Sequence, residues 1–477
     1  MHPLVQRADI KKKKVGMDET VIRGRVPSLT TVESEETIPK EVDVVVVGGG
    51  TAGVSTALFL AEKGIRVCLC EKGEIAAEQS SRNWGWTRQM GRDPLEMPLT
   101  IQSLNLWRTL KSRFGIEAGY KETGITYICK AKWEIEQAQG WARDGVEHGL
   151  PLKELTAREI EELVPGIAPG QTYGLHTSTD GRAEPGLAVP AFAEAARKLG
   201  AHIVTQCAVR GLEKSGGAVS GVVTEKGTIK CSSVVVAGGV WSRMFLGNND
   251  VALPQLNIIA AAARVENPDT GDNVGPNFPI GGAAFGLRKR DDGGYTVGPR
   301  NINIAPITPD SFRFLGDFFP VFLKSWRELS LRFGKDFFEE LMMRRTWNLD
   351  EVTPFEGVRV LNPPPSDWML NKSLKGLKET LPAFRNARVT HAWGGAIDAT
   401  ADGVPVIDGV EKVPGLYIAS GLSGHGFGAG PAVGQMMAEI VTGDDTTVDR
   451  TPFRFNRFRS TRHLSTFKPD LKQAAAE

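Results

Sequence analysis

The sequence is poor in cysteine and in net charge, and each shortage removes a class of function. Lysine and arginine total 57 against 56 acidic residues, so no overall field favours nucleic acid or an anionic membrane as partner. The cysteines are few, odd in number and without metal-ligand spacing: Cys68, Cys70, Cys129, Cys207 and Cys231. They predict buried thiols in a reducing compartment, with no metal site.

Uninterrupted apolar runs are also lacking. Residues 44–61 carry no charge, but four glycines interrupt them, so a strand followed by a helix explains them better than a membrane span. The lysines at 11–14 precede no apolar segment, which argues against a secretory signal. Residues 1–40 are polar and predict an N-terminal arm. We therefore expect a cytoplasmic protein without a transmembrane segment; oligomer formation stays open.

The most informative feature that is present is a dinucleotide-binding pattern near the start of the chain. Residues 44–47 are four consecutive valines, as in a strand that is buried on both faces. Gly48, Gly50 and Gly53 follow as G-x-G-x-x-G. This spacing allows a tight turn, close approach to a pyrophosphate and close packing of the next helix on the strand. The phosphates are expected at that helix N-terminus.

The acid that belongs to this pattern is Glu71. Apolar residues recur at helical spacing up to Ala61, Gly64 ends the helix, and residues 65–69 alternate as a second strand. Glu71 follows that strand, where its carboxylate can accept hydrogen bonds from a ribose. The sequence therefore predicts a complete βαβ nucleotide-binding unit.

Beyond this unit, the chain alternates between helices, strands and glycine loops. Residues 76–95 are polar, aromatic and rich in hydrogen-bond donors, and form a candidate ligand loop. The predicted helices span 95–114, 156–164 (Thr156 as N-cap, Glu159 completing a capping box) and 190–199. A hairpin is predicted through 222–229, and a second buried strand over 231–239.

The second half of the chain changes character. Residues 251–390 contain short apolar segments and many prolines, with a helix predicted over 321–333 and ended by Gly334. We interpret them as an inserted second domain of sheet and helix. Residues 416–443 again give a strand, a glycine loop and a helix, which is another arrangement that can bind an anion or a polar ring edge.

Several stretches together resemble the D-amino-acid-oxidase-type family of FAD-dependent oxidoreductases, which includes sarcosine, glycine and other amine-oxidising flavoenzymes. The stretches are GGGTAGVSTALFLAEKG with CEKG, SSRNWGWTR (80–88), DGRAEPGLAVPAFAEAARKLGA (180–201), VVVAGGVWS (234–242), WGGAIDATADGVPVIDG (393–409) and ASGLSGHGFGAGPAVGQMMAE (419–439). The resemblance runs from about residue 41 to residue 458 and keeps the family's order.

The resemblance implies an α/β fold with a Rossmann-like FAD-binding domain and an inserted α+β substrate domain that carries an antiparallel sheet. The implied limits are 1–40 for the arm, 41–95, 180–250 and 391–458 for the discontinuous FAD-binding domain, 96–179 and 251–390 for the substrate domain, and 459–477 for a tail. The first glycine loop would hold the adenylate half of FAD and the late glycine loop the isoalloxazine ring.

By the same resemblance, residues of several separate regions would contact non-covalently bound FAD. Val209 would pack near the adenine. The residues expected to line the ribityl chain and ring are Ser81, Arg82, Asn83, Gly85 and Trp86, and those of the flavin-ring loop are Gly424, Gly426, Phe427 and Gly428. The assigned cofactor residues are Gly48, Gly50, Thr51, Ala52, Gly53, Glu71, Lys72, Ser80, Ser81, Arg82, Asn83, Gly85, Trp86, Val209, Ala237, Gly238, Trp241, Gly394, Gly424, His425, Gly426, Phe427 and Gly428. His425 has a second interpretation as a local hydrogen-bonding residue.

The implied reaction is oxidation of a C–N bond in a small amine or amino acid by hydride transfer to flavin N5, followed by hydrolysis of the imine. Arg88 is the candidate for holding a substrate carboxylate or tuning the flavin, with a structural ion pair as the alternative. Arg300 is a second cationic candidate. Trp84, Trp86 and Trp393 are candidates for the wall of an amine pocket, or for ordinary core residues.

Two departures from the family leave the electron acceptor open. No cysteine follows Cys231, which excludes one form of covalent flavin attachment, and the loop at 82–84 offers no histidine. Thr296 stands where sarcosine oxidases carry a lysine that supports oxygen reduction. Oxygen or another acceptor therefore remains possible, as in a flavin dehydrogenase. A flavoprotein subunit without independent catalysis is the non-enzymatic alternative, and an NAD(P)H-using enzyme is disfavoured because no second nucleotide fingerprint is present.

Overall fold

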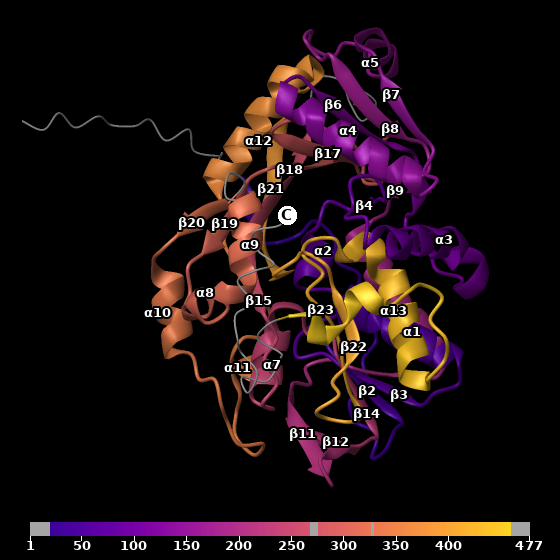
Figure 1. Cartoon of the computed structure of the whole chain (residues 1–477), viewed down its shortest axis with the longest axis vertical. Helices are drawn as coiled ribbons and strands as arrows, with labels where there is room; N and C mark the ends of the chain where they lie inside the picture. The colour runs from indigo at the N-terminus through magenta and orange to yellow at the C-terminus, as the bar shows by residue number, and fades with distance from the viewer. Residues whose placement is uncertain (1–19, 268–274, 326–328, 459–477) are drawn as a thin grey trace, which may run out of the picture.

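The computed structural model describes residues 20–267, 275–325 and 329–458. Within these ranges the chain forms two large sheets, and Figure 1 shows the smaller sheet with its helices beneath the larger one. Residues 1–19 of the predicted arm, which include the lysine run at 11–14, and the tail at 459–477 lie outside the described residues. Residues 20–40 contain one short strand, β1 (Ile22–Arg23), which pairs with the large sheet.

The smaller sheet is the nucleotide-binding sheet that the valine runs predict. Its six strands are ordered β10 (His202–Val204), β3 (Val67–Cys70), β2 (Val44–Val47), β14 (Ser233–Val236), β23 (Leu416–Ser420) and β22 (Val406–Gly409). All pairs are parallel except β22 with β23. The second buried strand and the final strand-loop-helix unit are therefore confirmed. In this sheet β14 pairs with β2, and β23 pairs with β14.

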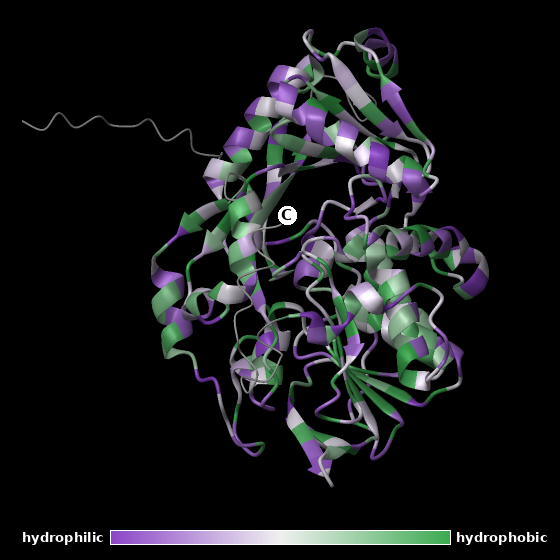
Figure 2. Cartoon of the chain, viewed as in Figure 1, coloured by the Kyte–Doolittle hydropathy of each residue, from purple (hydrophilic) through white to green (hydrophobic). Residues whose placement is uncertain are grey.

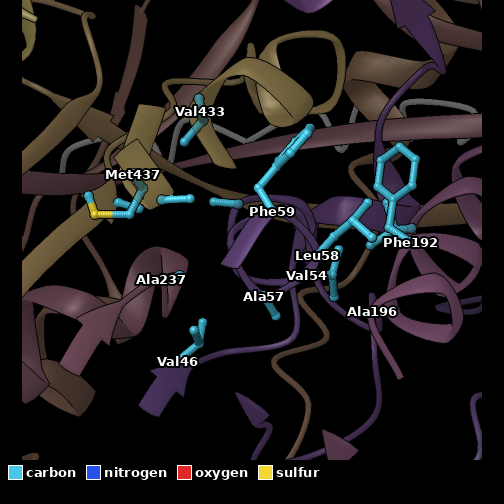
Figure 3. Packing of buried hydrophobic residues seen from close by; sticks show 14 of the residues in the cluster. Val46, Val54, Ala57, Leu58, Phe59, Phe192, Ala196, Ala237, Val433 and Met437 are labelled. Atoms are coloured by element: carbon cyan, nitrogen blue, oxygen red, sulfur yellow. The ribbon is translucent and has the colours of Figure 1, made fainter. Parts of the chain in front are cut away.

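Helices cover this sheet and build the principal core. They are α1 (Thr51–Glu62), α3 (Met97–Phe114), α6 (Pro185–Lys198) and α13 (Gly426–Thr442). Figure 3 shows Val54, Leu58 and Phe59 of α1 among side chains of the sheet, α6 and α13. Burial of such side chains contributes roughly 1.5–3 kcal/mol each. This packing fixes the N-termini of α1 and α13 side by side, because the two helices contact each other along their length.

The larger sheet has 11 strands and carries most of the second half of the chain. Its main path runs β1, β21 (Arg388–Thr400), β15 (Gln255–Glu266), β18 (Tyr295–Pro299), β17 (Phe285–Lys289), β16 (Ile280–Gly281), β6 (Ile125–Cys129), β8 (Tyr173–Thr177) and β7 (Leu152–Leu155). Off this path, β19 (Asn303–Pro306) pairs with β15, and β20 (Leu329–Arg332) pairs with β19. The long β15 and β21 pair antiparallel from Gln255 with Thr400 to Glu266 with Arg388.

Two small sheets and several short helices complete the described elements. The small sheets are β11 (Val209–Ser215), β12 (Ala218–Thr224) and β13 (Gly227–Lys230), and β4 (Trp86–Thr87), β9 (Gly181–Arg182) and β5 (Lys121–Glu122). The helices are α2 (Gln79–Arg82), α4 (Lys132–Glu147), α5 (Ala157–Leu163), α7 (Ser242–Gly247), α8 (Pro309–Arg313), α9 (Leu315–Ser325), α10 (Lys335–Met342), α11 (Pro354–Gly357) and α12 (Asp367–Thr380). Short 3₁₀ turns lie at Gly239–Trp241, Pro382–Phe384, Thr451–Phe453 and Phe455–Arg457.

Most predicted elements are confirmed, and two differ from the prediction. The capping box at Thr156 and Glu159 is present, and β12 and β13 form the predicted hairpin. The single helix over 321–333 is wrong: α9 ends at Ser325, and residues 329–332 form β20 beside β19. The helix N-terminus at Pro190 is also wrong, because α6 begins at Pro185, where a proline fits the first turn.

The distribution of polarity agrees with two covered sheets. Figure 2 shows apolar strands in the smaller sheet and polar residues along the outer side of α4 and α12. No helix in the described part of the chain is long and apolar enough to cross a membrane. All five cysteines are buried free thiols; the cytoplasmic location and the domain limits remain predictions. α3, which those limits assign to the substrate domain, packs on α13.

Candidate cofactor and substrate site

One cavity of about 500 Å³ joins the two sheets. It runs from the glycine turn before α1, past the loop around α2, to the N-terminus of α13 and to side chains of the large sheet. Most of the residues assigned from the sequence line it: Gly48, Gly50, Thr51, Ala52, Glu71, Lys72, Ser80, Arg82, Asn83, Trp84, Trp86, Arg88, Val209, Ala237, Gly238, Trp241, Arg300, Gly424, His425, Gly426, Phe427 and Gly428. Residues far apart in the sequence therefore share one cavity.

The first and third glycines of the nucleotide pattern leave no space for a side chain. Gly48 has φ +112°, and a Cβ there would lie 2.5 Å from the Ala237 carbonyl oxygen. A Cβ on Gly53 would lie 1.9 Å from the Gly48 carbonyl oxygen. Larger residues would push α1 away from β2. The N-terminus of α1, which has no acidic residue in its first turn, thus faces the cavity with its dipole uncompensated.

Glu71 fixes the glycine turn from the end of β3. Its Oε2 accepts a hydrogen bond from the Gly49 N–H at 2.6 Å and its Oε1 accepts one from the Gly73 N–H at 2.7 Å. Burial raises the pKa of this carboxyl group against the effect of the two N–H donors. Each carboxylate oxygen retains a second lone pair, so Glu71 can also accept a hydroxyl group of a ligand in the cavity.

A small polar network closes the same end of the cavity. Lys72 Nζ lies 2.7 Å from Glu78 Oε1 and 4.5 Å from the centre of the Trp241 ring. The Trp241 indole N–H donates to the Glu78 carboxylate at 3.1 Å. The charges of Lys72 and Glu78 therefore satisfy each other, and Glu78 is a lining residue that sequence reasoning missed.

Residues 422–425 of the second glycine loop also line the cavity and lead into α13. The N-cap residue His425 makes no side-chain cap, and the first turn of α13 contains no acid. Asp398 of β21 holds the preceding loop, because its Oδ2 accepts the Gly421 N–H at 2.7 Å. Burial raises the pKa of Asp398 to about 6. The N-terminus of α13 is thus positioned to face a polar or anionic ring edge.

Aromatic side chains form a continuous wall between this loop and the large sheet. The ring centres of Trp84 and Trp86 lie 5.4 Å apart, those of Trp86 and Tyr127 lie 5.9 Å apart, and those of Tyr127 and Trp141 lie 5.0 Å apart. Trp84 lies against Gly286 and Gly298, which pair across β17 and β18. A Cβ on Gly298 would lie 2.0 Å from Trp84 Nε1, so these glycines make room for the indole.

Arg88 and Arg300 contact this wall, and neither is paired with a carboxylate. Arg88 Nη1 donates to the Tyr127 hydroxyl oxygen and, at 3.2 Å, to the Met90 carbonyl oxygen. Arg300 Nη1 donates to the Gly282 carbonyl oxygen at 3.0 Å, and its guanidinium lies 4.4 Å from the Tyr127 ring centre. Burial lowers the pKa of Arg300 from its ordinary value. The structural ion pair considered for Arg88 is therefore absent from the described contacts.

Five assigned residues are not among the described residues that line the cavity: Gly53, Ser81, Gly85, Trp393 and Gly394. Trp393 and Gly394 instead support the lining from β21. The Trp393 indole N–H donates to the Arg82 carbonyl oxygen at 2.9 Å, and the Gly394 carbonyl oxygen accepts from Arg82 Nη1 at 2.9 Å. Thr296 is not a lining residue either, and its Oγ1 accepts a hydrogen bond from Arg290 Nη1 at 3.2 Å.

Several further lining residues were missed from the sequence: Arg92, Tyr127, Gln137, Trp141 and Asp398. Arg92 belongs to the loop at 76–95 that the sequence did indicate as a ligand loop, so its position was a usable signal. Tyr127 and Trp141 come from β6 and α4, whose apolar and amphipathic patterns resemble any other core element. Only the pairing of β6 with β8 and β16 brings them to the cavity.

Comparisons with known proteins agree with this geometry. Residues 43–440 match the family model described as FAD dependent oxidoreductase. The β subunit of sarcosine oxidase from Arthrobacter sp is 24% identical over 89% of this chain and 93% of its own. Glycine oxidase from Pseudomonas aeruginosa is 24% identical over 86% of this chain and 97% of its own.

Solved structures give a similar result. The L-amino acid deaminase from Proteus myxofaciens, in complex with anthranilate, superposes with a TM-score of 0.85 at 33% identity, over 91% of this chain and 98% of that one. The L-amino acid deaminase from Proteus vulgaris gives 0.84 at 31% identity, over 90% and 100%. The residues that line the cavity, from Val47 to Gly428, all lie within the range 43–440 that matches the family model.

Proposed function

The chain belongs to the family of FAD-dependent oxidoreductases, and from that premise we propose that it oxidises the C–N bond of a small amine or amino acid to an imine that water hydrolyses. The relatives named for sarcosine, glycine and L-amino acids support this substrate class. The observation that carries the proposal is the placement of Arg88, Arg300 and the aromatic wall in the same cavity as the two glycine loops.

The residues present fit FAD. The glycine turn before α1 leaves room for a pyrophosphate beside a helix N-terminus that has no acid in its first turn and whose Thr51 N–H is bonded to Ser80 Oγ at 2.9 Å. Glu71 has lone pairs left for a ribose, and α13 presents a second N-terminus without acids. When bound, FAD supplies the acceptor for the two electrons of the oxidation. The protein supplies position and surroundings.

The chain's own part in the reaction is to bind, orient and desolvate the substrate. Arg88 and Arg300 would hold a substrate carboxylate, since their guanidinium groups use only neutral acceptors in the structure and carboxylates accept from arginine in pairs. The indoles of Trp84 and Trp86 would cover the carbon that bears nitrogen and keep water from it. His425 would stay neutral, because burial lowers its pKa.

An anaerobic flavin-reduction screen tests the proposal. D- and L-amino acids, N-methyl amino acids and simple amines are mixed with the flavin-loaded protein, and loss of the oxidised flavin absorbance is followed. Arg300→Met should raise the substrate concentration for half-maximal reduction about a hundredfold, because it removes hydrogen bonds to a charged group. Arg88→Met should act in the same direction, and flavin affinity should stay unchanged in both variants. Failure of every amine to bleach the flavin contradicts the proposal.

For the electron acceptor we propose a carrier other than oxygen. Among the described residues that line the cavity, the single lysine is Lys72, which is paired with Glu78 at the nucleotide end; Thr296 is not a lining residue. The reduced protein should therefore reoxidise faster with a quinone or dye than with dissolved oxygen, as measured by stopped-flow absorbance. Faster reoxidation by oxygen would instead make the protein an oxidase.

A further inference from the structure

A third arginine at the aromatic end of the cavity has no use in the proposal so far. Arg92 lines the cavity, is 6% exposed, and its Nε and Nη1 have no hydrogen-bond partner among the residues that the structure describes. Burying an unpaired guanidinium is costly, and an unsatisfied buried group in a folded protein calls for an explanation. Because Arg92 is a lining residue, an anion bound in the cavity would lie beside it.

The nearby acids do not provide that compensation through hydrogen bonds. Glu96 and Asp180 are the carboxylates that act on Arg92 electrostatically. Glu96 Oε2 lies 3.0 Å from His425 Nδ1. Asp180 Oδ1 accepts the Gln89 N–H at 2.8 Å, and its Oδ2 accepts the Met90 N–H at 3.3 Å. Neither acid is among the described residues that line the cavity.

The three arginines together offer more donors than one carboxylate can use. Arg88 and Arg300 bond neutral acceptors, and Arg92 leaves two nitrogens unbonded. Arg88 lies close enough to Arg92 and to Arg300 for like-charge repulsion on both. Each guanidinium has five N–H donors, whereas a carboxylate has about four acceptor positions. A second anionic group in the ligand would satisfy the surplus and relieve the repulsion.

We infer that the cavity recognises an amino acid whose side chain ends in a second carboxylate. Arg88 and Arg300 hold the carboxylate next to the amine-bearing carbon, and Arg92 holds the carboxylate of the side chain. The reaction on such a substrate rests on the proposed amine oxidation. The recognition of two carboxylates rests on the cavity alone, so the two ideas can fail separately.

The first experiment compares acidic amino acids with their amides. Aspartate, glutamate and 2-aminoadipate, with asparagine and glutamine as matched controls, are tested for anaerobic flavin reduction. The best acidic substrate should exceed its amide in kcat/KM by about tenfold to a hundredfold, the size of a hydrogen-bonded charge contact. Arg92→Met should bring this ratio close to one, and Arg92→Lys should keep part of it. Arg290→Met removes a buried arginine outside the cavity lining and should preserve the ratio.

The second experiment needs no turnover. Binding of glutarate, which has two carboxylates, is compared with that of glutaramate, which has one carboxylate and an amide, through the shift in the melting temperature of the flavin-loaded protein. Glutarate should bind at least about tenfold tighter, and Arg92→Met should remove the difference. Equal binding of the two ligands to the unaltered protein overturns the inference, even if neutral amino acids are oxidised.

A purely structural role for Arg92 gives a different result. If Arg92 held the loop in place, Arg92→Met would lower the melting temperature and reduce kcat/KM for acids and amides by the same factor. The inference instead requires a change in the ratio with no fall in melting temperature, since the variant removes an unpaired buried charge. An equal loss for both substrates, or a lowered flavin affinity that explains the loss, would also overturn it.

Discussion

Two groups of buried or half-buried arginines in the described part of the chain differ in what their guanidinium groups bond. Outside the cavity lining, Arg182 is paired with Asp291, Arg288 with Glu184 and Arg290 with Asp292. In the cavity, Arg88, Arg92 and Arg300 bond neutral atoms or nothing. The first group is compensated within the fold, so removing one partner would leave an uncompensated charge. The second group leaves charge for a ligand.

The paired group also acts on the site indirectly. The Arg288 side chain is fully buried, and its Nη1 is bonded to Glu184 Oε1 at 2.5 Å. Its Nε donates to the Trp84 carbonyl oxygen at 2.6 Å. The ion pair therefore anchors the loop that carries Trp84 and Trp86. The contacts of Arg288 outside the cavity lining therefore help to hold the aromatic wall in the cavity in position.

The largest expected effect breaks the paired group. Arg288→Met leaves Glu184 buried with fewer partners and frees the Trp84 carbonyl, so the free energy of unfolding should fall by about 3–5 kcal/mol. Urea unfolding of the variant, followed by fluorescence, measures this loss. A change below about 1 kcal/mol would mean that the ion pair carries little of the stability.

The next effect concerns an acid that lies near the cavity arginines without bonding them. Burial raises the pKa of Asp180 to about 6 from its ordinary value of 3.8. The folded chain thus binds more protons than the unfolded chain between about pH 4 and pH 6, and the free energy of unfolding should fall as pH rises through that window. The slope is at most about 1.4 kcal/mol per pH unit.

Asp180→Asn should remove this contribution to the slope, since it keeps an acceptor for the Gln89 N–H without a charge. Unfolding by urea at a series of pH values from 4 to 7 provides the measurement. The exposed Asp350→Asn serves as the control for loss of one carboxyl group. An unaltered slope in the Asp180 variant would show that Asp180 titrates normally in the folded chain.

A smaller effect of opposite sign is expected in the cavity group. Arg92→Met should leave the free energy of unfolding without ligand unchanged or raise it by about 1 kcal/mol, because it removes an unsatisfied buried charge. Thermal unfolding beside Arg288→Met compares the two groups directly. A loss as large as that of Arg288→Met would remove the distinction between them.

The smallest effect belongs to a pair on the surface. Arg113 Nε lies 2.6 Å from Glu62 Oε1, with side chains that are 40% and 28% exposed. A double-mutant cycle of Arg113→Ala and Glu62→Ala should give a coupling free energy below about 1 kcal/mol. A coupling free energy as large as the stability loss expected for Arg288→Met would mean that burial does not determine how strongly these ion pairs contribute.

The first nucleotide-binding unit and the late glycine loop could be predicted because their physics is local. A valine strand, glycines at fixed spacing and an acid at the end of the next strand specify the turn regardless of what surrounds it, and Glu71 lies where that pattern requires. The helix predicted over 321–333 failed for the opposite reason. Residues 329–332 become a strand because β19 is available as a partner, and pairing is not a local property.

The sequence by itself determined the dinucleotide turn, the buried strands around it and the loop at 76–95, since each depends on neighbours along the chain. The tertiary structure alone decided that Arg300 contacts the rings of Tyr127 and Trp141. It also decided that the Trp393 indole N–H bonds the Arg82 carbonyl oxygen, and that Arg92 Nε and Nη1 have no hydrogen-bond partner among the described residues. Those facts depend on which segments far apart in the sequence meet, and therefore on sheet pairing and packing that no single segment encodes.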